Sequence, residues 1–412
     1  HNIVTLECIV IMAERKKAGE RLAPTVSTAL RGQGVSESLI PKAKELLNVT
    51  SIEEALENFR KGKYPNIPMG LRKVLESIDE ASASGIPPSI MMQVCDALHP
   101  QGSGTRDLAL YSTLKTKKKE EMASHGGSNS QIYIIQLKTA SGTAQIDKDY
   151  VLKEITVPKT DKEGVALARL ELYAHQLADT DLNNGRGTDK LIAPILGQFY
   201  EATKDNHKFY ILLELYDMKS LFHVAFEKNL MPPGSTKDAK YENYRKAMAY
   251  VTCRAVDTFE KLLEKGYFPR DVNMGSLLFQ KGSGLVSLCD FGFPIFKDTH
   301  KDAVIAALKE NKLLSDEDAK KIAASFLKDA KTFASHGEHK FRDVVEMGLN
   351  WASGFNPSSG GSAGIRVDYL FDLYDLQDEV EEAKDRCTLT LTKYGIATAK
   401  GTFMGAAGDG IT

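Results

Sequence analysis

The sequence predicts an α+β fold in which helices come first, a small sheet follows and helices come last. Residues 1–105 have the i, i+3, i+4 apolar spacing of amphipathic helices. From about residue 125 the pattern changes to the short apolar runs that are typical of β-strands. From Leu221 onward the spacing is again mainly helical. With 412 residues, the chain is too long for one ordinary hydrophobic core, so two or three domains are expected.

The composition argues against several classes of protein. The net charge of −2, from 53 basic and 55 acidic residues, gives no reason to expect nucleic acid or an anionic membrane as a partner. Five widely spaced cysteines without a C-x-x-C pair indicate reduced thiols in a cytoplasmic compartment, and they argue against a zinc site. The apolar stretch Ile3–Met12 is too short for a transmembrane segment, and no basic region precedes it as in a signal peptide. It is therefore interpreted as a buried helix or strand.

Three helices are expected in the N-terminal region. Ser51 and Glu54 have the spacing of a capping box, which places the start of one helix at Ser51. Met69–Ala83 is amphipathic and predicts a second helix. Ser89–Leu98 predicts a third, after a break at two consecutive prolines. Because no catalytic pattern occurs here, residues 1–105 are interpreted as an all-helical accessory domain.

Residues 106–217 are expected to form a small sheet that carries a single helix. The expected strands are Gln131–Leu137, Asp149–Ile155, Leu191–Tyr200 and Lys208–Leu215. The helix, Lys162–Asp179, lies between the second and the third of these strands. Ahead of the sheet, the charged run Lys115–Glu121 is interpreted as the solvated face of a helix, with a basic docking patch as the alternative.

Residues 218–412 are expected to form a mainly helical region. Its first long helix, about Tyr244–Glu264, should end at Gly266, because glycine readily adopts the left-handed conformation at a helix end. A β-hairpin follows, with strands Leu277–Phe279 and Leu285–Cys289. Further helices are expected at Ser315–Lys331 and Val367–Asp385.

Two acidic residues flank this hairpin. Asp271 follows Arg270 ahead of the first strand, and Asp290 follows the second strand and opens an Asp-Phe-Gly tripeptide. Phosphoryl transfer needs a base near the acceptor hydroxyl and a carboxylate that binds the metal ion of the nucleotide. Asp271 is therefore the candidate base, and Asp290 is the candidate metal ligand.

Two charged residues of the predicted sheet and helix complete the candidate site. Lys153 lies within an apolar strand, where an ammonium group could contact phosphates. Glu171 lies in an apolar helix and should need a cation, because an unpaired buried charge is costly. Lys153 is the expected partner of Glu171. If Glu171 faces solvent instead, Glu163 takes its place.

Together these features resemble a divergent protein-kinase domain over residues 120–295, a little under half of the chain. The strand that contains Lys153 resembles the V-A-I-K strand of the family, and the tripeptide at Asp290 resembles its D-F-G motif. The stretch Phe209–Asp217 resembles the strand that leads into the adenine-binding linker, so Glu214 and Leu215 are candidate nucleotide contacts. The resemblance implies a two-lobed kinase-like domain, with lobes 106–217 and 218–412, that binds ATP and Mg²⁺.

The chain departs from the family at two motifs. In the stretch aligned with the glycine-rich loop, only Gly127 falls on a family glycine, and the candidate phosphate contacts are Gly126, Gly127 and Ser128. In the catalytic turn, Pro269 replaces a histidine, and Ser276 replaces the asparagine that holds a second metal ion. The candidate metal ligands are Asp290, Ser276 and Asn273. The candidate catalytic residues are Asp271, Lys153, Glu171 and Arg270.

The D-x-N-x-G pattern of Asp271–Gly275 is similar to that of compact Ser/Thr kinases that pathogenic bacteria deliver into host cells. This resemblance implies phosphoryl transfer to Ser or Thr of a protein substrate, with a host protein as one candidate. It also implies a virulence effector secreted into the host cytoplasm as the alternative to a cytoplasmic protein. No Ala-Pro-Glu follows Asp290, so activity is expected to be constitutive or gated by an activating partner. Three alternatives stay open: a pseudokinase or scaffold, an AMP transferase of the same fold, and a lipid or small-molecule kinase.

Overall fold

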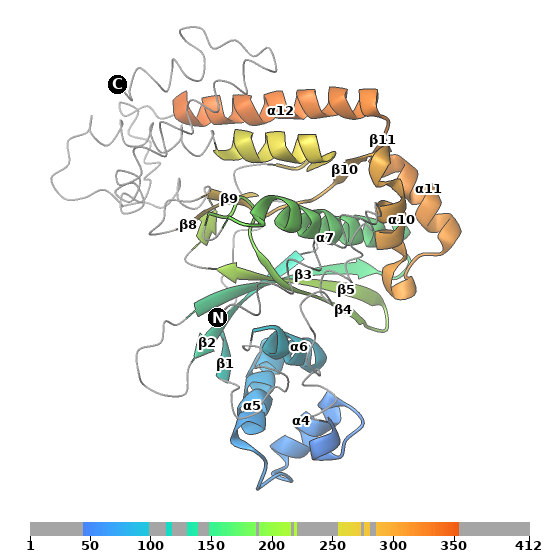
Figure 1. Cartoon of the computed structure of the whole chain (residues 1–412). Coiled ribbons are helices and arrows are strands. Elements are labelled where there is room, and N and C mark those ends of the chain that lie inside the picture. The colour runs from blue at the N-terminus through green and yellow to red at the C-terminus, as the bar shows by residue number, and fades with distance from the viewer. Residues whose placement is uncertain are drawn as a thin grey trace, which may run out of the picture.

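The computed structural model describes residues 44–98, 113–117, 130–138, 148–186, 189–215, 218–220, 254–272, 276–280 and 286–353. These residues form a mixed structure of helices and strands, which confirms the predicted α+β class (Figure 1). A five-stranded sheet lies at the centre, with helices on both of its faces. Within the described ranges, no helix is long and apolar enough to span a bilayer.

The five-stranded sheet has the order β1-β2-β3-β5-β4, and each neighbouring pair is antiparallel. Its strands are β1 (Thr113–Lys117), β2 (Ser130–Lys138), β3 (Lys148–Pro158), β4 (Ile195–Ala202) and β5 (Asn206–Leu215). β3 is the middle strand, and Lys153 lies opposite Ile132 of β2 and Ile211 of β5. Because side chains alternate along a strand, Lys153 shares one face of the sheet with Val151 and Ile155.

One face of the sheet is covered by α7 (Lys162–Asn183), the single helix that separates β3 from β4. The side chain of Asp161 caps its start by accepting a hydrogen bond from the Gly164 amide. The helix runs four residues beyond its predicted end. Asn183 fixes that end, because its side-chain oxygen accepts hydrogen bonds from the amides of Leu191 and Ile192. Asn183 thereby ties the end of α7 to residues 191–192, which precede β4.

The opposite face is covered by α5 (Met69–Ala83) and α6 (Pro88–Leu98), and α4 (Ile52–Arg60) packs against these two helices. They match the three helices predicted for this region. Ser51 caps α4 as expected, whereas the carboxylate of Glu54 binds the amide and hydroxyl of Thr50 instead of the Ser51 amide. These helices share a hydrophobic cluster with inward-facing residues of the sheet: Tyr133, Ile135, Tyr150, Leu152, Tyr210 and Leu212. Their burial is thus tied to the sheet, and the domain boundary near residue 105 stays a prediction.

The C-terminal half begins with a helix over residues 254–265, which stops at Gly266 as predicted. Gly266 has a φ of 89°, the left-handed conformation that a helix stop of this kind requires. Two small sheets follow. One has the order β11-β10-β7, with strands β7 (Tyr267–Pro269), β10 (Pro294–Lys297) and β11 (Leu327–Lys328). The other has the order β6-β8-β9, with strands β6 (Met218–Ser220), β8 (Leu277–Gln280) and β9 (Val286–Leu288).

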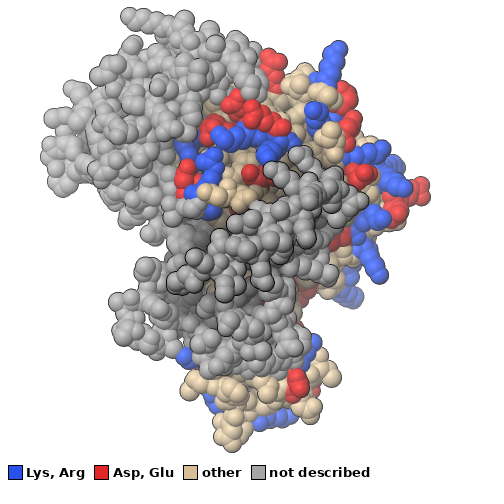
Figure 2. Space-filling model, viewed as in Figure 1, with Lys and Arg blue, Asp and Glu red and all other residues tan. Residues whose placement is uncertain are grey.

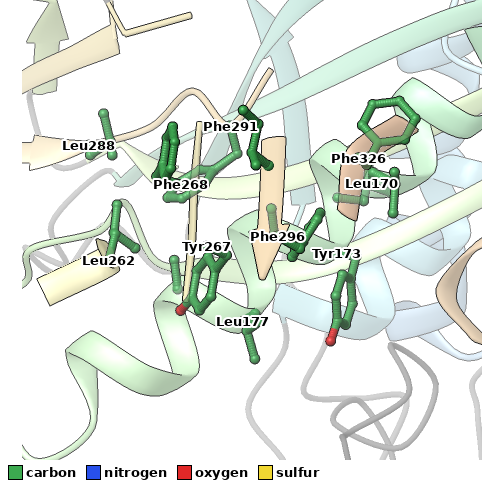
Figure 3. Close-up of a cluster of buried hydrophobic side chains, with 14 of the residues drawn as sticks. Leu170, Tyr173, Leu177, Leu262, Tyr267, Phe268, Leu288, Phe291, Phe296 and Phe326 are labelled. Carbon is green, nitrogen blue, oxygen red and sulfur yellow. The ribbon is translucent and has the colours of Figure 1, made fainter. Parts of the chain in front are cut away.

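The remaining helices are α10 (Lys301–Lys309), α11 (Asp316–Phe326) and α12 (Ala330–Ser353), with two short 3-10 turns, η3 (Asp298–His300) and η4 (Glu310–Lys312). Side chains of α7, the sheet and these helices form one continuous core, and Figure 3 shows a part of it around Phe268, Phe291 and Phe296. On the face shown in Figure 2, basic and acidic side chains are interspersed over this half instead of being separated by sign. This core packs the C-terminal helices against α7 and the sheet.

Two sequence interpretations of secondary structure are wrong, and two elements are not predicted by the sequence. Residues 113–117, interpreted in part as a helix, form β1, because their backbone pairs with β2, and lysines are well suited to such an edge strand. The helix predicted over Ser315–Lys331 ends at Phe326, because Leu327 and Lys328 pair with β10. Neither β10 nor the long helix α12 was anticipated. The predictions for Ile3–Met12, the glycine-rich loop and Val367–Asp385 lie outside the described residues.

Candidate active site

Lys153 and Glu171 form the predicted ion pair. The Lys153 Nζ atom lies 2.6 Å from the Glu171 Oε1 atom. The alternation of β3 points Lys153 toward α7, and Glu171 faces it from the third turn of that helix. Both side chains are largely buried, with 20 % and 16 % of their surface exposed. The interpretation in which Glu163 replaces Glu171 is not needed, since Glu163 lies in the exposed first turn of α7.

Asp290 brings a third charge to this pair. Its Oδ1 atom lies 3.9 Å from the Lys153 Nζ atom and accepts a hydrogen bond from the Gly292 amide at 3.2 Å. The Asp290 side chain is more open than the other two, with 36 % of its surface exposed. Three charged residues from distant parts of the sequence therefore converge, and one carboxylate remains accessible to solvent.

The electrostatic environment keeps Lys153 charged. Burial alone would lower the pKa of its ammonium group, but Glu171 and Asp290 outweigh burial and raise this pKa well above its usual value. Burial raises the pKa of the Glu171 carboxyl, while Lys153 acts to lower it and Asp290 to raise it. The 2.6 Å separation favours an ionised pair. Burial and the neighbouring Asp290 raise the pKa of the Cys289 thiol to about 12, so this thiol is protonated and unreactive at neutral pH.

Phe291 anchors the segment that carries Asp290. Its ring is fully buried and stacks on the imidazole of His175, with ring centroids 4.8 Å apart. The His175 Nε2 atom lies 2.9 Å from the Ala193 carbonyl oxygen, to which it donates. Burial lowers the pKa of His175 to about 4, so the ring is neutral at neutral pH. His175 lies one turn after Glu171 on α7, and this spacing is the signal by which sequence reasoning could have found it.

The predicted hairpin brings Ser276 next to the segment that carries Asp290. β8 and β9 pair antiparallel, and the Cys289 amide donates to the Ser276 carbonyl at 2.9 Å. The Ser276 hydroxyl is buried and donates to the Asp271 carbonyl at 3.4 Å. Asp271 itself is exposed at the surface. Ser276 thus contacts both ends of the hairpin, Asp271 before the first strand and Cys289 after the second.

Arg270 holds the chain that follows the Asp-Phe-Gly tripeptide. Its Nε atom donates to the Phe293 carbonyl at 3.1 Å. Phe293 has a φ of 50°, and its side chain is about half exposed. From there the chain enters β10, which pairs with β7 just ahead of Arg270. This segment is therefore fixed by backbone pairing and by one arginine.

Several candidate residues cannot be placed. Gly126, Gly127, Ser128 and Asn273 lie outside the described residues. The backbone of Glu214 and Leu215 lies at the end of β5, opposite Tyr150 and Asp149 of β3. Among the residues that the structure describes, no group of three or more His, Cys, Asp or Glu side chains is arranged to hold a metal ion.

No protein-family model matches this chain, and no curated protein matches it.

Proposed function

We propose that this protein is a kinase-like phosphotransferase that moves the γ-phosphoryl group of ATP to a Ser or Thr hydroxyl of a protein. The observation that carries the proposal is the contact of Lys153 with two carboxylates, Glu171 at 2.6 Å and Asp290 at 3.9 Å. In enzymes that transfer phosphoryl groups, a lysine positioned by a carboxylate binds the nucleotide phosphates close to an aspartate that binds the metal ion. In this proposal the five-stranded sheet with α7 is one lobe and the C-terminal helices belong to the other.

Each side chain would have a separate role. Lys153 has three N–H donors and would bind nucleotide phosphates, while Glu171 holds it in position. Asp271 would accept the proton of the acceptor hydroxyl as its oxygen bonds to the γ-phosphorus. The bond from the γ-phosphorus to the bridging oxygen breaks, and ADP leaves. Arg270 would keep the neighbouring segment in place through Phe293.

The Asp290 carboxylate would suit a magnesium ion. Mg²⁺ is usually held by one or two carboxylates together with substrate phosphates. The Asp290 carboxylate is partly exposed and faces Lys153, so it would hold the ion, with Asn273 and Ser276 as further candidates. When bound, Mg²⁺ supplies neutralisation of the charge on the β- and γ-phosphates.

The test is transfer of label from γ-labelled ATP in the presence of Mg²⁺. The full chain, with casein as a general acceptor, should gain label and the mass of one phosphoryl group. Asp290→Ala and Asp271→Asn should abolish this gain. Asp298→Ala is the matched control, because Asp298 is an exposed aspartate outside the site. Addition of a whole AMP group would contradict the proposal and support nucleotidyl transfer.

The environment of Ser276 favours a second candidate, a nucleotide-binding scaffold that transfers no phosphate. The Ser276 hydroxyl is buried and bonded within its own turn, which is a structural role. Pro269, which pairs with Pro294 of β10, is likewise a structural residue where the resemblance expects a histidine. A rise in melting temperature with ATP, combined with no transfer of label, would identify this scaffold.

A further inference from the structure

A cavity of about 410 Å³ lies between α12 and the paired strands β7 and β10, on the C-terminal side of the molecule. Phe268 and Ile295, both buried, form its apolar floor. Exposed polar side chains of α12 and of the turn after β7 form its rim. Ligand sites of proteins commonly have this size and this division between floor and rim.

The rim is rich in basic groups. Arg270 contributes from the turn, and α12 contributes His336, His339 and Lys340. The α12 residues recur at the spacing of one helix face, so the basic groups are presented together. Asp343 is the carboxylate on this rim, and it lies 3.7 Å from the Lys340 Nζ atom. The cavity is thus lined by two permanently charged bases, Arg270 and Lys340, and by one acid.

Two of these groups are held in place. Arg270 uses its Nε atom to bind the Phe293 carbonyl, and a guanidinium has further N–H groups beyond that one. The His336 Nδ1 atom lies 2.8 Å from the Thr332 carbonyl oxygen, to which it donates. Side chains that are already oriented lose less conformational entropy when an anion binds.

We propose that this cavity binds a phosphate monoester on a peptide, namely a phosphoserine or phosphothreonine side chain of a partner or substrate. Arg270 and Lys340 are both permanently charged and line the same cavity, which suits the double charge of a phosphate monoester better than a single carboxylate. The cavity is much larger than a phosphate group, and its apolar floor offers contact to the carbon atoms that carry the group. Since Arg270 adjoins Asp271, a peptide held here would pass beside the candidate base. The binding itself does not depend on the proposed catalysis.

The test is direct binding to the purified full chain, measured by fluorescence anisotropy. The probes are three labelled peptide libraries with one fixed central residue: phosphothreonine, threonine or glutamate. The phosphothreonine library should bind about tenfold more tightly than the other two, as expected for charge-assisted hydrogen bonds. Equal binding of the threonine library, or of the glutamate library, would overturn the proposal.

Variants of α12 locate the binding. The double variant His339→Gln and Lys340→Gln should weaken binding of the phosphothreonine library about tenfold, and Asp343→Asn should strengthen it. Lys331→Gln is the matched control, because Lys331 is an exposed lysine of the same helix outside the cavity. An equal loss in Lys331→Gln would overturn the assignment to the cavity. Competition with inorganic phosphate is the second check. If inorganic phosphate displaces the labelled library at the same concentration as the unlabelled phosphopeptide, free phosphate is the ligand and the proposal is overturned.

Discussion

Arg169 of α7 is buried against Glu310, at the start of η4, and the two side chains form an ion pair. The Nε atom of Arg169 also donates to the Ala307 carbonyl at 3.3 Å, and its guanidinium lies 6.0 Å from the centre of the Phe209 ring. Arg169 is only two residues from Glu171. The helix that carries Glu171 is therefore also held against the C-terminal helices.

Loss of the Arg169–Glu310 pair should destabilise the protein. Glu310→Gln leaves the buried Arg169 charge without its counterion, which should cost about 3 kcal/mol of unfolding free energy. Urea unfolding of the variant and the wild type measures this difference. Lys162→Gln is the control, because it breaks an exposed ion pair to Asp318 between the same helix and α11, and it should have little effect. Equal effects of the two variants would contradict the special role of Arg169.

The sequence predicts the parts of the site that depend on local pattern. An apolar strand before Lys153, an apolar helix around Glu171 and a hairpin ahead of Asp290 are visible in the residues alone. The pair of Lys153 and Glu171 follows from the cost of an unpaired buried charge. The structure contains this pair and the hairpin.

The remaining features depend on residues that are far apart in the sequence. Arg169 and Glu310 are separated by 141 positions, and nothing in either segment indicates the other. The short strands β10 and β11 exist because each finds a partner in the folded chain. Their sequences alone do not distinguish them from loop or helix, and the predicted helix at Ser315 was therefore extended too far.

Gly266 should not tolerate a side chain. Its φ of 89° is unfavourable for alanine, and a Cβ atom there would lie 3.1 Å from the His300 Nε2 atom. Gly266→Ala should lower the free energy of unfolding by about 1–2 kcal/mol. Gly62→Ala is the control, since Gly62 has a similar φ of 70° but open space around it. Thermal unfolding of both variants separates the backbone strain from the contact with His300. An equal loss of stability in both variants would show that the contact with His300 contributes nothing.

His175 should make stability depend on pH. Its folded pKa of about 4 lies below the value of about 6.5 for an unfolded histidine, so the unfolded chain binds the extra proton first. The contribution of His175 to the free energy of unfolding is constant above pH 6.5 and is lost progressively as the pH falls toward 4. The total loss is about 3 kcal/mol. His175→Gln should show a smaller loss of stability between pH 7 and pH 5 than the wild type. Urea midpoints at the two pH values measure this, and parallel losses would mean that His175 does not titrate on unfolding.

Glu171→Gln should impair both nucleotide binding and transfer, because Lys153 would lose the carboxylate that orients it. Misplacement of a positioned group costs at least about tenfold in rate. Glu163→Gln is the matched control, since Glu163 lies on the exposed first turn of the same helix. The change in melting temperature with ATP and the rate of label transfer are measured for both variants. If Glu171→Gln keeps the ATP-dependent rise in melting temperature but loses transfer, Glu171 acts by orienting Lys153 for the reaction and not by supporting binding. If both properties equal those of Glu163→Gln, the pair of Lys153 and Glu171 is a structural ion pair, and the proposed function loses the observation that carries it.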